Sequence, residues 1–456
     1  AGGAPLSAAM EPLVEALAPP ADVLDEAQRA PTPAAALDLL GAAYREDTPQ
    51  TAALEAALRR QDTMAESLVA MERAARPAHF FARETRPLGA LLGDRLTLSP
   101  TRVEQYYRCR FSYFLQYVLR IRPRRRAELS PLESGSLVHY ILEHVMRRAD
   151  AEFPRLAPEE LARLAGEVTD QYVAENMPAA GRRFAYLVER LKRGVTRLLA
   201  YLQAEQAQSL FHPAAFEQEI GTGEGAVPPL TLRTPDGRTV QVQGKIDRVD
   251  VMEREGRTYL RVVDYKTGNK AFNLDEVYCG LNTQMLLYLF TLRSNAAQVY
   301  KNPVAAGVLY LAGDPVLKTG SRAEAAAAPV YKVDGLVLND ELVVRGMDRD
   351  ATGMFVPFAF GKDGAPRASA KLASLEKLGN IEKHLDALVV EMARGLYAGE
   401  IDAVPLRTAA HCPCDVCDYR PVCLHEDGRG ETSVQAPKDV FETRADACKA
   451  QGEGNI

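Results

Sequence analysis

The sequence predicts an α/β fold, in which hydrophobic strands form a sheet and apolar or amphipathic helices pack on it. Alternating apolar residues on both sides of the turn at 255–256 predict a hairpin of two strands, 240–252 and 258–266. The stretch 281–292 is apolar over a length that favours a helix, and the compact run 304–311 is typical of a buried strand. These three features place strands and helices within one continuous part of the chain.

Length and composition are those of an ordinary soluble, globular protein. The chain has 456 residues, which allow two or three domains, and 47% of them are hydrophobic and 25% charged. No apolar run approaches the roughly 18 residues that a membrane-spanning helix needs. The amino terminus has no basic leader before an apolar core, so we expect no secretory signal, and the lack of an initiating Met suggests a piece of a longer polypeptide. The net charge of −6 argues against polyanion binding by the chain as a whole.

Residues 1–97 are rich in Ala, with helical stretches such as 51–76 between Pro-rich breaks. We expect a helical scaffold there, the remnant of a larger protein, with no readable chemistry. A new element begins at Ser99, because Ser caps helices and the Pro that follows it suits the first helical position. Aromatic residues recur at helical spacing between 106 and 117, and we interpret them as core.

Later segments alternate between helical and irregular patterns. The stretch 147–210 contains two apolar stripes at helical spacing, which predict a helical insertion that covers a site or lines a channel. Residues 312–370 mix short strand-like runs with breaks rich in Gly, Asp and Ala, and we expect a second insertion there. The stretch 374–396 predicts an amphipathic helix, and 431–456 reads as a polar tail.

The central hairpin brings charged residues together. If the turn has two residues, Arg254 faces Arg257 and Asp247 lies directly opposite Asp264. Directly opposed Cβ atoms are roughly 4.5–5.5 Å apart, and like charges so placed destabilise a sheet. A divalent cation between the two carboxylates would reverse that effect. Because side chains alternate along a strand, Lys266 shares a face with Asp264, and the three groups indicate a site.

These residues also carry a family resemblance. The chain contains, in order, Gly244 with Asp247-Arg248 and Asp250, then the run Asp264-Tyr265-Lys266-Thr267-Gly268, then Gln284 and Tyr288. This order resembles the motifs G-x-x-D-R-x-D, D-Y-K-T/S-G and Q-x-x-x-Y of the RecB-like branch of the PD-(D/E)xK nucleases. The resemblance implies a restriction-endonuclease-like core, a central mixed sheet flanked by helices, within a nuclease domain at 98–430.

The same resemblance implies metal-dependent hydrolysis of DNA phosphodiester bonds. Asp247 and Asp264, with His139 and the Tyr265 carbonyl, would hold Mg²⁺ or Mn²⁺, since oxygen ligands with one imidazole suit these ions. His139 resembles the His of the family's first motif, and it shares a helix face with Glu143. Lys266 would orient the attacking water or stabilise the transition state. Gln284 and Tyr288 would line the cleft near the scissile phosphate.

Two further features are less specific. The family often carries a Glu on the strand before the first catalytic Asp, and here we select Glu219 over Glu217. Five guanidinium groups lie within seven residues, and this run is either a solvated face or a phosphate-tracking patch; it comprises Arg120, Arg122, Arg124, Arg125 and Arg126.

Seven cysteines, four of them between residues 412 and 423, are unlike a secreted disulfide framework and indicate a metal site. Cys414, Cys417 and Cys423 form C-x2-C-x5-C, which leaves a four-ligand site one short. The candidates for the fourth ligand are Cys109, Cys412, His411 and His425. A zinc site and an iron–sulfur cluster both remain open on spacing alone.

A remote cysteine after an S-P-T helix, paired with this terminal pattern, resembles the iron–sulfur staple of AddB-type nucleases. That resemblance assigns Cys109, Cys414, Cys417 and Cys423 to a four-iron four-sulfur cluster. The cluster would close a loop of about 300 residues and remove entropy from the unfolded chain. Arg110 stands where the family commonly has Pro. Cys279 and Cys448 read as ordinary thiols.

The resemblance finally implies partners and a setting. The partners are a single DNA strand with a free end and an AddA-type helicase subunit. The process is double-strand break resection and recombinational repair. The location is the bacterial cytoplasm, with no membrane contact. The chain has no G-x-x-x-x-G-K-[ST] phosphate loop, so we expect no ATPase. Two alternatives remain: a non-catalytic nuclease-like module that binds DNA or a partner, and a zinc-stapled structural domain.

Overall fold

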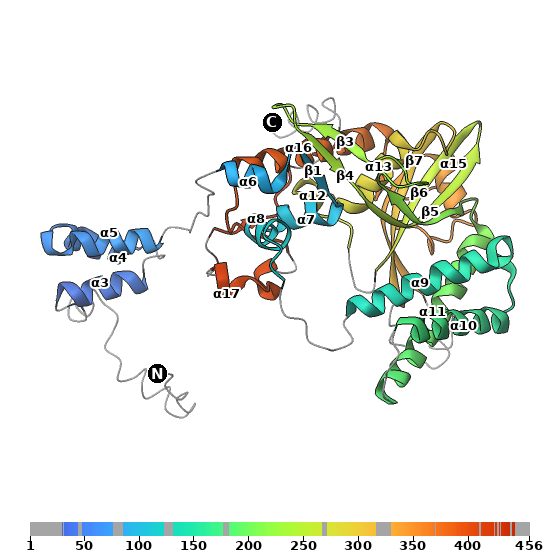
Figure 1. Cartoon of the computed structure of the whole chain (residues 1–456), viewed down its shortest axis with the longest axis horizontal. Helices are drawn as coiled ribbons and strands as arrows, with labels where there is room; N and C mark the ends of the chain where they lie inside the picture. The colour runs from blue at the N-terminus through green and yellow to red at the C-terminus, as the bar shows by residue number, and fades with distance from the viewer. Residues whose placement is uncertain are drawn as a thin grey trace. The chain divides into compact units, whose positions relative to one another are not determined.

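The computed structural model describes residues 30, 32–43, 48–75, 85–122, 131–176, 182–266, 271–315, 330–369, 371–409, 412–423, 425, 428, 430–437 and 440–442. The chain divides into two compact units, residues 1–79 and 80–456 (Figure 1). Among the described residues, no helix combines the length and the apolar character needed to cross a membrane.

The first unit is a small group of helices. Its described elements are α3 (Pro33–Ala42), α4 (Pro49–Arg59), a 3-10 turn η1 (Asp62–Met64) and α5 (Ala65–Ala75). Thr32 and Thr48 cap α3 and α4 by accepting backbone hydrogen bonds from Ala35 and Thr51. Among the described residues of this unit, Leu40, Leu58 and Leu68 form a buried cluster. The stretch 51–76 therefore contains two helices separated by a short turn.

The second unit is built on a mixed six-stranded sheet, in agreement with the predicted fold class. Its strands, in spatial order, are β2 (His212–Ile220), β5 (Gly244–Arg254), β6 (Arg257–Lys266), β7 (Pro303–Pro315), β8 (Tyr331–Leu338) and β9 (Leu372–Ala373). The pairs β6–β7 and β8–β9 are parallel, and the other pairs are antiparallel.

The register predicted for the central hairpin is confirmed. Arg254 faces Arg257, and the pairing continues without a shift to Arg248 opposite Val263. Glu255 and Gly256 both have positive φ, 51° and 73°. A two-residue turn with positive φ at both positions matches the twist of the strands that it joins, which is why it sets the register.

The predicted strand 240–252 is two strands that belong to different sheets. β4 (Thr239–Val242) lies in a three-stranded sheet between β1 (Arg95–Leu98) and β3 (Leu230–Arg233), whereas β5 begins at Gly244. A Cβ atom at Gly244 would lie 2.3 Å from the Tyr288 hydroxyl, so only Gly fits where the chain enters the larger sheet. The apolar alternation continues across this break, and it hides the change of sheet.

Helices cover both faces of the six-stranded sheet (Figure 1). α13 (Gln284–Asn295) packs on β6 and β7, and α16 (Leu375–Ala398) packs on α13. On the opposite face, α11 (Arg182–Gln208) contacts β7 and packs with α9 (Pro131–Ala149) and α10 (Pro158–Asn176). The described residues of the stretch 147–210 are thus helical except at 156–157 and 209–210.

Two predicted boundaries fall inside the core of the second unit. β1 straddles residue 97 and pairs in parallel with β4, and α6 (Thr85–Leu92) before it contacts α16. The predicted insertion 312–370 contributes β8 to the central sheet and α15 (Glu341–Met347) beside it. Its strand is short and contains Asp334 and Gly335, which is why the pattern resembles a loop.

Candidate active site

Three charged side chains meet where β5 and β6 run side by side. The Lys266 Nζ atom lies 2.9 Å from Oδ1 and 2.7 Å from Oδ2 of Asp264. The carboxyl groups of Asp247 and Asp264 are neighbours, and each affects the pKa of the other. Asp247 Oδ2 also accepts the Tyr265 backbone N–H at 3.3 Å. The convergence predicted from the hairpin register is therefore present.

His139 reaches the same patch from α9. Its Nδ1 atom lies 3.4 Å from Asp247 Oδ2, and its Nε2 atom is 2.8 Å from the Tyr265 carbonyl oxygen. Burial disfavours the charged imidazolium, but the hydrogen bond and charge of Asp247 and the Tyr265 carbonyl outweigh it and raise the pKa of His139 to about 9. The imidazole is therefore protonated at neutral pH in the metal-free protein.

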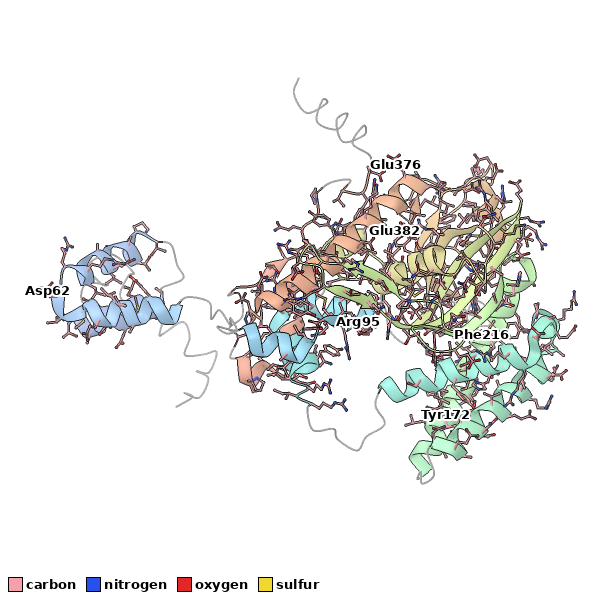
Figure 2. All side chains as sticks on the ribbon, turned by 45° about the horizontal axis from the view of Figure 1, so that its top comes forward. Asp62, Arg95, Tyr172, Phe216, Glu376 and Glu382 are labelled. Atoms are coloured by element: carbon pink, nitrogen blue, oxygen red, sulfur yellow. The ribbon has the colours of Figure 1, made fainter. Side chains whose placement is uncertain are left out.

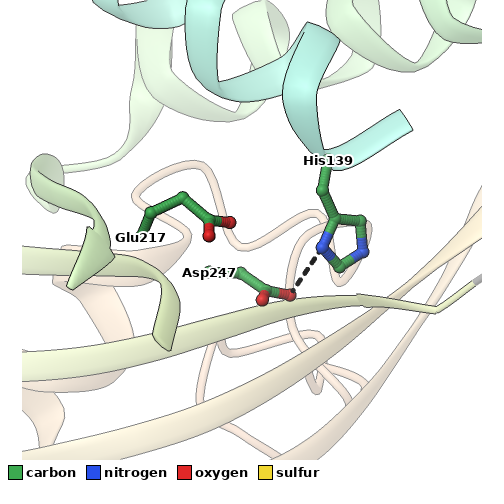
Figure 3. Close-up of side chains that lie close together, drawn as sticks. All are labelled: His139, Glu217 and Asp247. Carbon is green, nitrogen blue, oxygen red and sulfur yellow. Dashed lines mark ion pairs between the residues drawn. The ribbon is translucent and has the colours of Figure 1, made fainter. Parts of the chain in front are cut away.

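A glutamate completes a set of possible metal ligands. His139, Glu217 and Asp247 each offer one ligand atom, and these atoms lie within 4.8 Å of one another (Figure 3). Glu217 lies on β2, the strand that pairs with β5. Its φ of 50° is uncommon for residues other than Gly. Glu219 instead pairs with Lys245 farther along the ladder and is exposed. The structure thus places Glu217, and not the predicted Glu219, with the other two side chains.

The two aspartates differ in their electrostatic surroundings. Burial raises the pKa of Asp264 to about 6; the ammonium of Lys266 opposes the shift and the neighbouring Asp247 carboxylate adds to it. Burial acts on Asp247 in the same direction, but His139 and Lys266 keep its pKa below the usual value. Near pH 6 the patch thus holds one fully ionised carboxylate and one that is exchanging a proton.

Gln284 and Tyr288 lie in the first turns of α13 and hold β5 beside the patch. The Tyr288 hydroxyl lies against β5, since a Cβ atom at Gly244 would be 2.3 Å from it. Burial, with the charges of Asp247 and Asp264, raises the pKa of this hydroxyl to about 12. In this structure Tyr288 therefore packs on the strand that carries Asp247, and Gln284 lies one turn before it on the same helix.

Comparison with known families agrees with this arrangement. The family model described as the PD-(D/E)XK nuclease superfamily matches residues 97–424, more than half of the chain. The chain belongs to the PD-(D/E)XK nuclease superfamily. The carboxylates, the lysine and the mixed sheet therefore sit in a fold known for nucleases.

Three curated relatives of this PD-(D/E)XK chain share one name, which describes each as a subunit of an ATP-dependent helicase/deoxyribonuclease. The protein of Clostridium acetobutylicum is 31% identical over 368 residues, 76% of this chain and 32% of the relative. The protein of Acetivibrio thermocellus is 30% identical over 382 residues, 80% of this chain and 33% of the relative. The protein of Desulforudis audaxviator is 33% identical over 352 residues, 74% of this chain and 30% of the relative. The chain spans about a third of the length of these relatives.

On the face of the sheet opposite Asp247 lies a buried ionic network that the sequence did not reveal. Arg248 and Asp250 of the D-R-x-D motif point away from Asp247, because side chains alternate along β5. Arg248 donates to the Tyr265 hydroxyl at 2.7 Å, and Arg261 donates to Glu205 of α11 at 2.6 Å and to Asp250 at 3.0 Å. Two guanidinium groups and two carboxylates are thus buried together, and their charges cancel.

The terminal cysteines of the PD-(D/E)XK chain form a second candidate site. A cavity of ≈190 Å³ is lined by Cys109, Cys414, Cys417 and Cys423, with His425 at its wall. Burial raises the pKa of the Cys109 thiol to about 11, and burial with neighbouring thiols also raises that of Cys414.

The local structure explains how distant residues reach this cavity. Cys109 caps the C-terminus of α7 (Pro100–Arg108), and Cys414 lies in the 3-10 turn η4 (Pro413–Val416). Cys423 ends α17 (Arg420–Cys423). Cys412 is buried beside them, but its Sγ atom lies 3.9 Å from Glu431 Oε1 and it does not line the cavity. Four soft sulfur donors around one cavity suit zinc or an iron–sulfur cluster.

The remaining predicted residues are described in part. Arg120 and Arg122 are exposed, just after the helical segment that carries the aromatic residues between 106 and 117. Arg124, Arg125 and Arg126 lie outside the described residues, as do His411, Cys448 and the Thr267-Gly268 end of the motif. Figure 2 shows Phe216, the residue before Glu217, where β2 meets α9; its carbonyl oxygen accepts from Arg147 at 2.7 Å.

Proposed function

We propose that this chain is the nuclease part of an AddB-type subunit, a metal-dependent exonuclease that hydrolyses phosphodiester bonds from a free DNA end. The observation that carries the proposal is the meeting of Asp247, Asp264 and Lys266 on one patch, with His139 beside them. The name of the curated relatives, which contains the word deoxyribonuclease, supports DNA as the substrate.

Asp247, Asp264 and His139 would hold Mg²⁺ or Mn²⁺, and Glu217 joins them as a ligand candidate. A cation bound there lowers the pKa of a water ligand and neutralises charge on the phosphate. Lys266 donates to the attacking water or to a phosphoryl oxygen, from a position that Asp264 fixes at 2.7–2.9 Å. Gln284 and Tyr288, on the first turns of α13, would keep Asp247 in place through the contact of the Tyr288 hydroxyl with Gly244 of β5.

The cysteine site would hold a four-iron four-sulfur cluster through Cys109, Cys414, Cys417 and Cys423. The four residues line one cavity, whereas Cys412 faces Glu431. Bound there, the cluster would tie the start of the nuclease domain to its end and stabilise the fold as a long-range crosslink does. A brown protein with broad visible absorption and bound iron is expected, and a colourless protein that contains zinc instead would contradict the assignment.

The names of the relatives support a biological setting. We propose a single strand with a free end as the substrate, an AddA-type helicase subunit as the partner, and double-strand break resection in the bacterial cytoplasm as the process. The name of the curated relatives joins a helicase and a deoxyribonuclease. Arg120 and Arg122, with Arg124, Arg125 and Arg126, are the proposed contacts to the phosphate backbone.

A digestion assay tests the activity. End-labelled linear single strands and closed circular single strands are incubated with the protein, with and without Mg²⁺. We expect Mg²⁺-dependent degradation of the linear DNA only, and a loss of about 10²–10³-fold in Asp264→Asn and Lys266→Met. Asp236→Asn, which changes an exposed carboxylate in the β3–β4 turn, should retain full activity. Equal activity of Asp264→Asn and the unmodified protein would refute the proposal, and degradation of the circle would refute the free-end requirement.

A further inference from the structure

Glu104 of α7 is a buried carboxylate at the N-terminus of α13. Its side chain is 8% exposed, and its Oε1 atom accepts the backbone N–H of Gln284 at 3.1 Å. The first N–H groups of a helix have no partner within the helix, and they attract negative charge. Thr283, which occupies the cap position of α13, makes no side-chain cap. The cap is therefore supplied by a helix that lies 180 residues earlier in the chain.

α7 holds the turn before α13 at a second point. A Cβ atom at Gly280, where φ is +85°, would lie 2.3 Å from the ring of Tyr107. The Tyr107 hydroxyl donates to the Leu388 carbonyl of α16 at 2.6 Å, which fixes the ring. Between the two contacts, Asn282 has φ of 55°, a left-handed conformation that Asn adopts more readily than other non-Gly residues. The turn is thus contacted by α7 on both sides of Asn282.

The same turn leads directly to the catalytic strand. Glu104 holds the backbone of Gln284 at the start of α13, and Tyr288 lies one turn later on the same helix. The Tyr288 hydroxyl packs against Gly244, three residues before Asp247 on β5, where a Cβ atom would lie 2.3 Å from it. A continuous series of contacts therefore runs from Glu104 to the strand that carries Asp247.

We propose that Glu104 is a positioning residue that sets the first turn of α13 and, through Gln284 and Tyr288, the place of Asp247. This role rests on the proposed nuclease function. Glu104 contacts the backbone of Gln284, and its proposed effect on the site passes through that residue. Without its carboxylate the first turn of α13 is free to relax, and Tyr288 loses its fixed position against Gly244.

The test compares substitutions that keep or remove the hydrogen-bond acceptor. Glu104→Gln retains an acceptor oxygen of the same reach, Glu104→Ala removes it, and Glu104→Asp withdraws it by one methylene while keeping the charge. Asp340→Ala is the matched control, because Asp340 accepts the Val343 N–H at 3.2 Å and caps α15, which packs on β8. If Glu104→Ala fails to fold, Glu104→Asp carries the comparison.

Hydrogen exchange of a peptide covering 281–290 gives a readout that does not depend on catalysis. We expect faster exchange in Glu104→Ala and Glu104→Asp, and normal exchange in Glu104→Gln and Asp340→Ala. Steady-state kinetics on linear single-stranded DNA should show kcat reduced about ten- to a hundredfold in the first two variants, with restoration in Glu104→Gln. Adding Tyr288→Phe to Glu104→Ala should cost little more than the worse single change, because both act on one series of contacts.

Three results would overturn the proposal. They are unchanged exchange in Glu104→Ala and Glu104→Asp, a Glu104→Gln variant as impaired as Glu104→Ala, or an equal loss of kcat in Asp340→Ala. If the unmodified protein cleaves no DNA with any divalent cation, the nuclease function fails. The exchange comparison then still decides whether Glu104 holds α13.

Discussion

Binding of a divalent cation should release a proton from His139. The pKa of this imidazole is raised to about 9, chiefly by Asp247 acting against burial, so at pH 7.5 almost every metal-free molecule carries the proton. A nitrogen that binds a metal must give up its proton, so cation and proton compete. Raising the pH deprotonates the imidazolium and therefore favours metal binding. The affinity for the cation should rise with pH up to about 9.

The size of the effect follows from the two raised pKa values. Between about pH 6 and pH 9 only His139 exchanges its proton, so affinity should rise about tenfold for each pH unit, with roughly one proton released per ion. Below about pH 6 Asp264 also becomes protonated, because burial raises its pKa to about 6, and the dependence should become steeper. Above about pH 9 affinity should no longer change through His139.

Calorimetric titration with Mn²⁺ at pH 7.5, in two buffers that differ in ionisation enthalpy, measures the number of protons released. His139→Gln should release none at this pH and should show nearly flat affinity between pH 6.5 and 8.5. An unmodified protein that binds Mn²⁺ without proton release would refute the assignment of His139 as a ligand.

Four further substitutions test other parts of the structure. Gly244→Ala should reduce activity at least tenfold, since its Cβ atom would lie 2.3 Å from the Tyr288 hydroxyl and must displace β5 or α13; normal kcat in a steady-state assay would contradict this. Asp250→Asn should lower the free energy of unfolding by about 3–5 kcal/mol in urea titrations, because two buried guanidinium groups then share one carboxylate; an unchanged midpoint would show that the network contributes little. Cys109→Ser should abolish the visible absorption of a bound cluster while Cys412→Ser retains it, and the reverse pattern would exchange their roles.

The central hairpin could be predicted because its register is set locally. Glu255 and Gly256 form a two-residue turn, so pairing could be counted outward from it to Asp247 and Asp264. The pairing of β2 with β5 has no such turn, since the long connection between them builds β3 and β4. Nothing local therefore decides between Glu217 and Glu219, and the choice had to come from the structure.

The buried network shows a second limit of sequence patterns. Strand alternation already indicates that Arg248 and Asp250 face away from Asp247, but their partners come from elsewhere. Glu205 lies on α11 among helical residues, where an acidic side chain is ordinary. Only the packing of α11 on the sheet reveals that it neutralises a buried arginine.

The cysteines show the same limit in another form. The spacing of Cys414, Cys417 and Cys423 indicates a site that lacks one ligand, yet Cys109 and Cys412 are both available in the sequence. The structure distinguishes these two candidate ligands. Cys412 precedes η4 and faces Glu431, whereas Cys109 lines the cavity from the end of α7.

The central claim is that Asp247 and Asp264 form a metal centre, and anomalous diffraction from crystals soaked in Mn²⁺ tests it most directly. We predict one strong peak in contact with both carboxylates and with His139, and its loss in Asp264→Asn. A crystal of DNA-cleaving protein with manganese bound elsewhere, and none between these carboxylates, would contradict the claim.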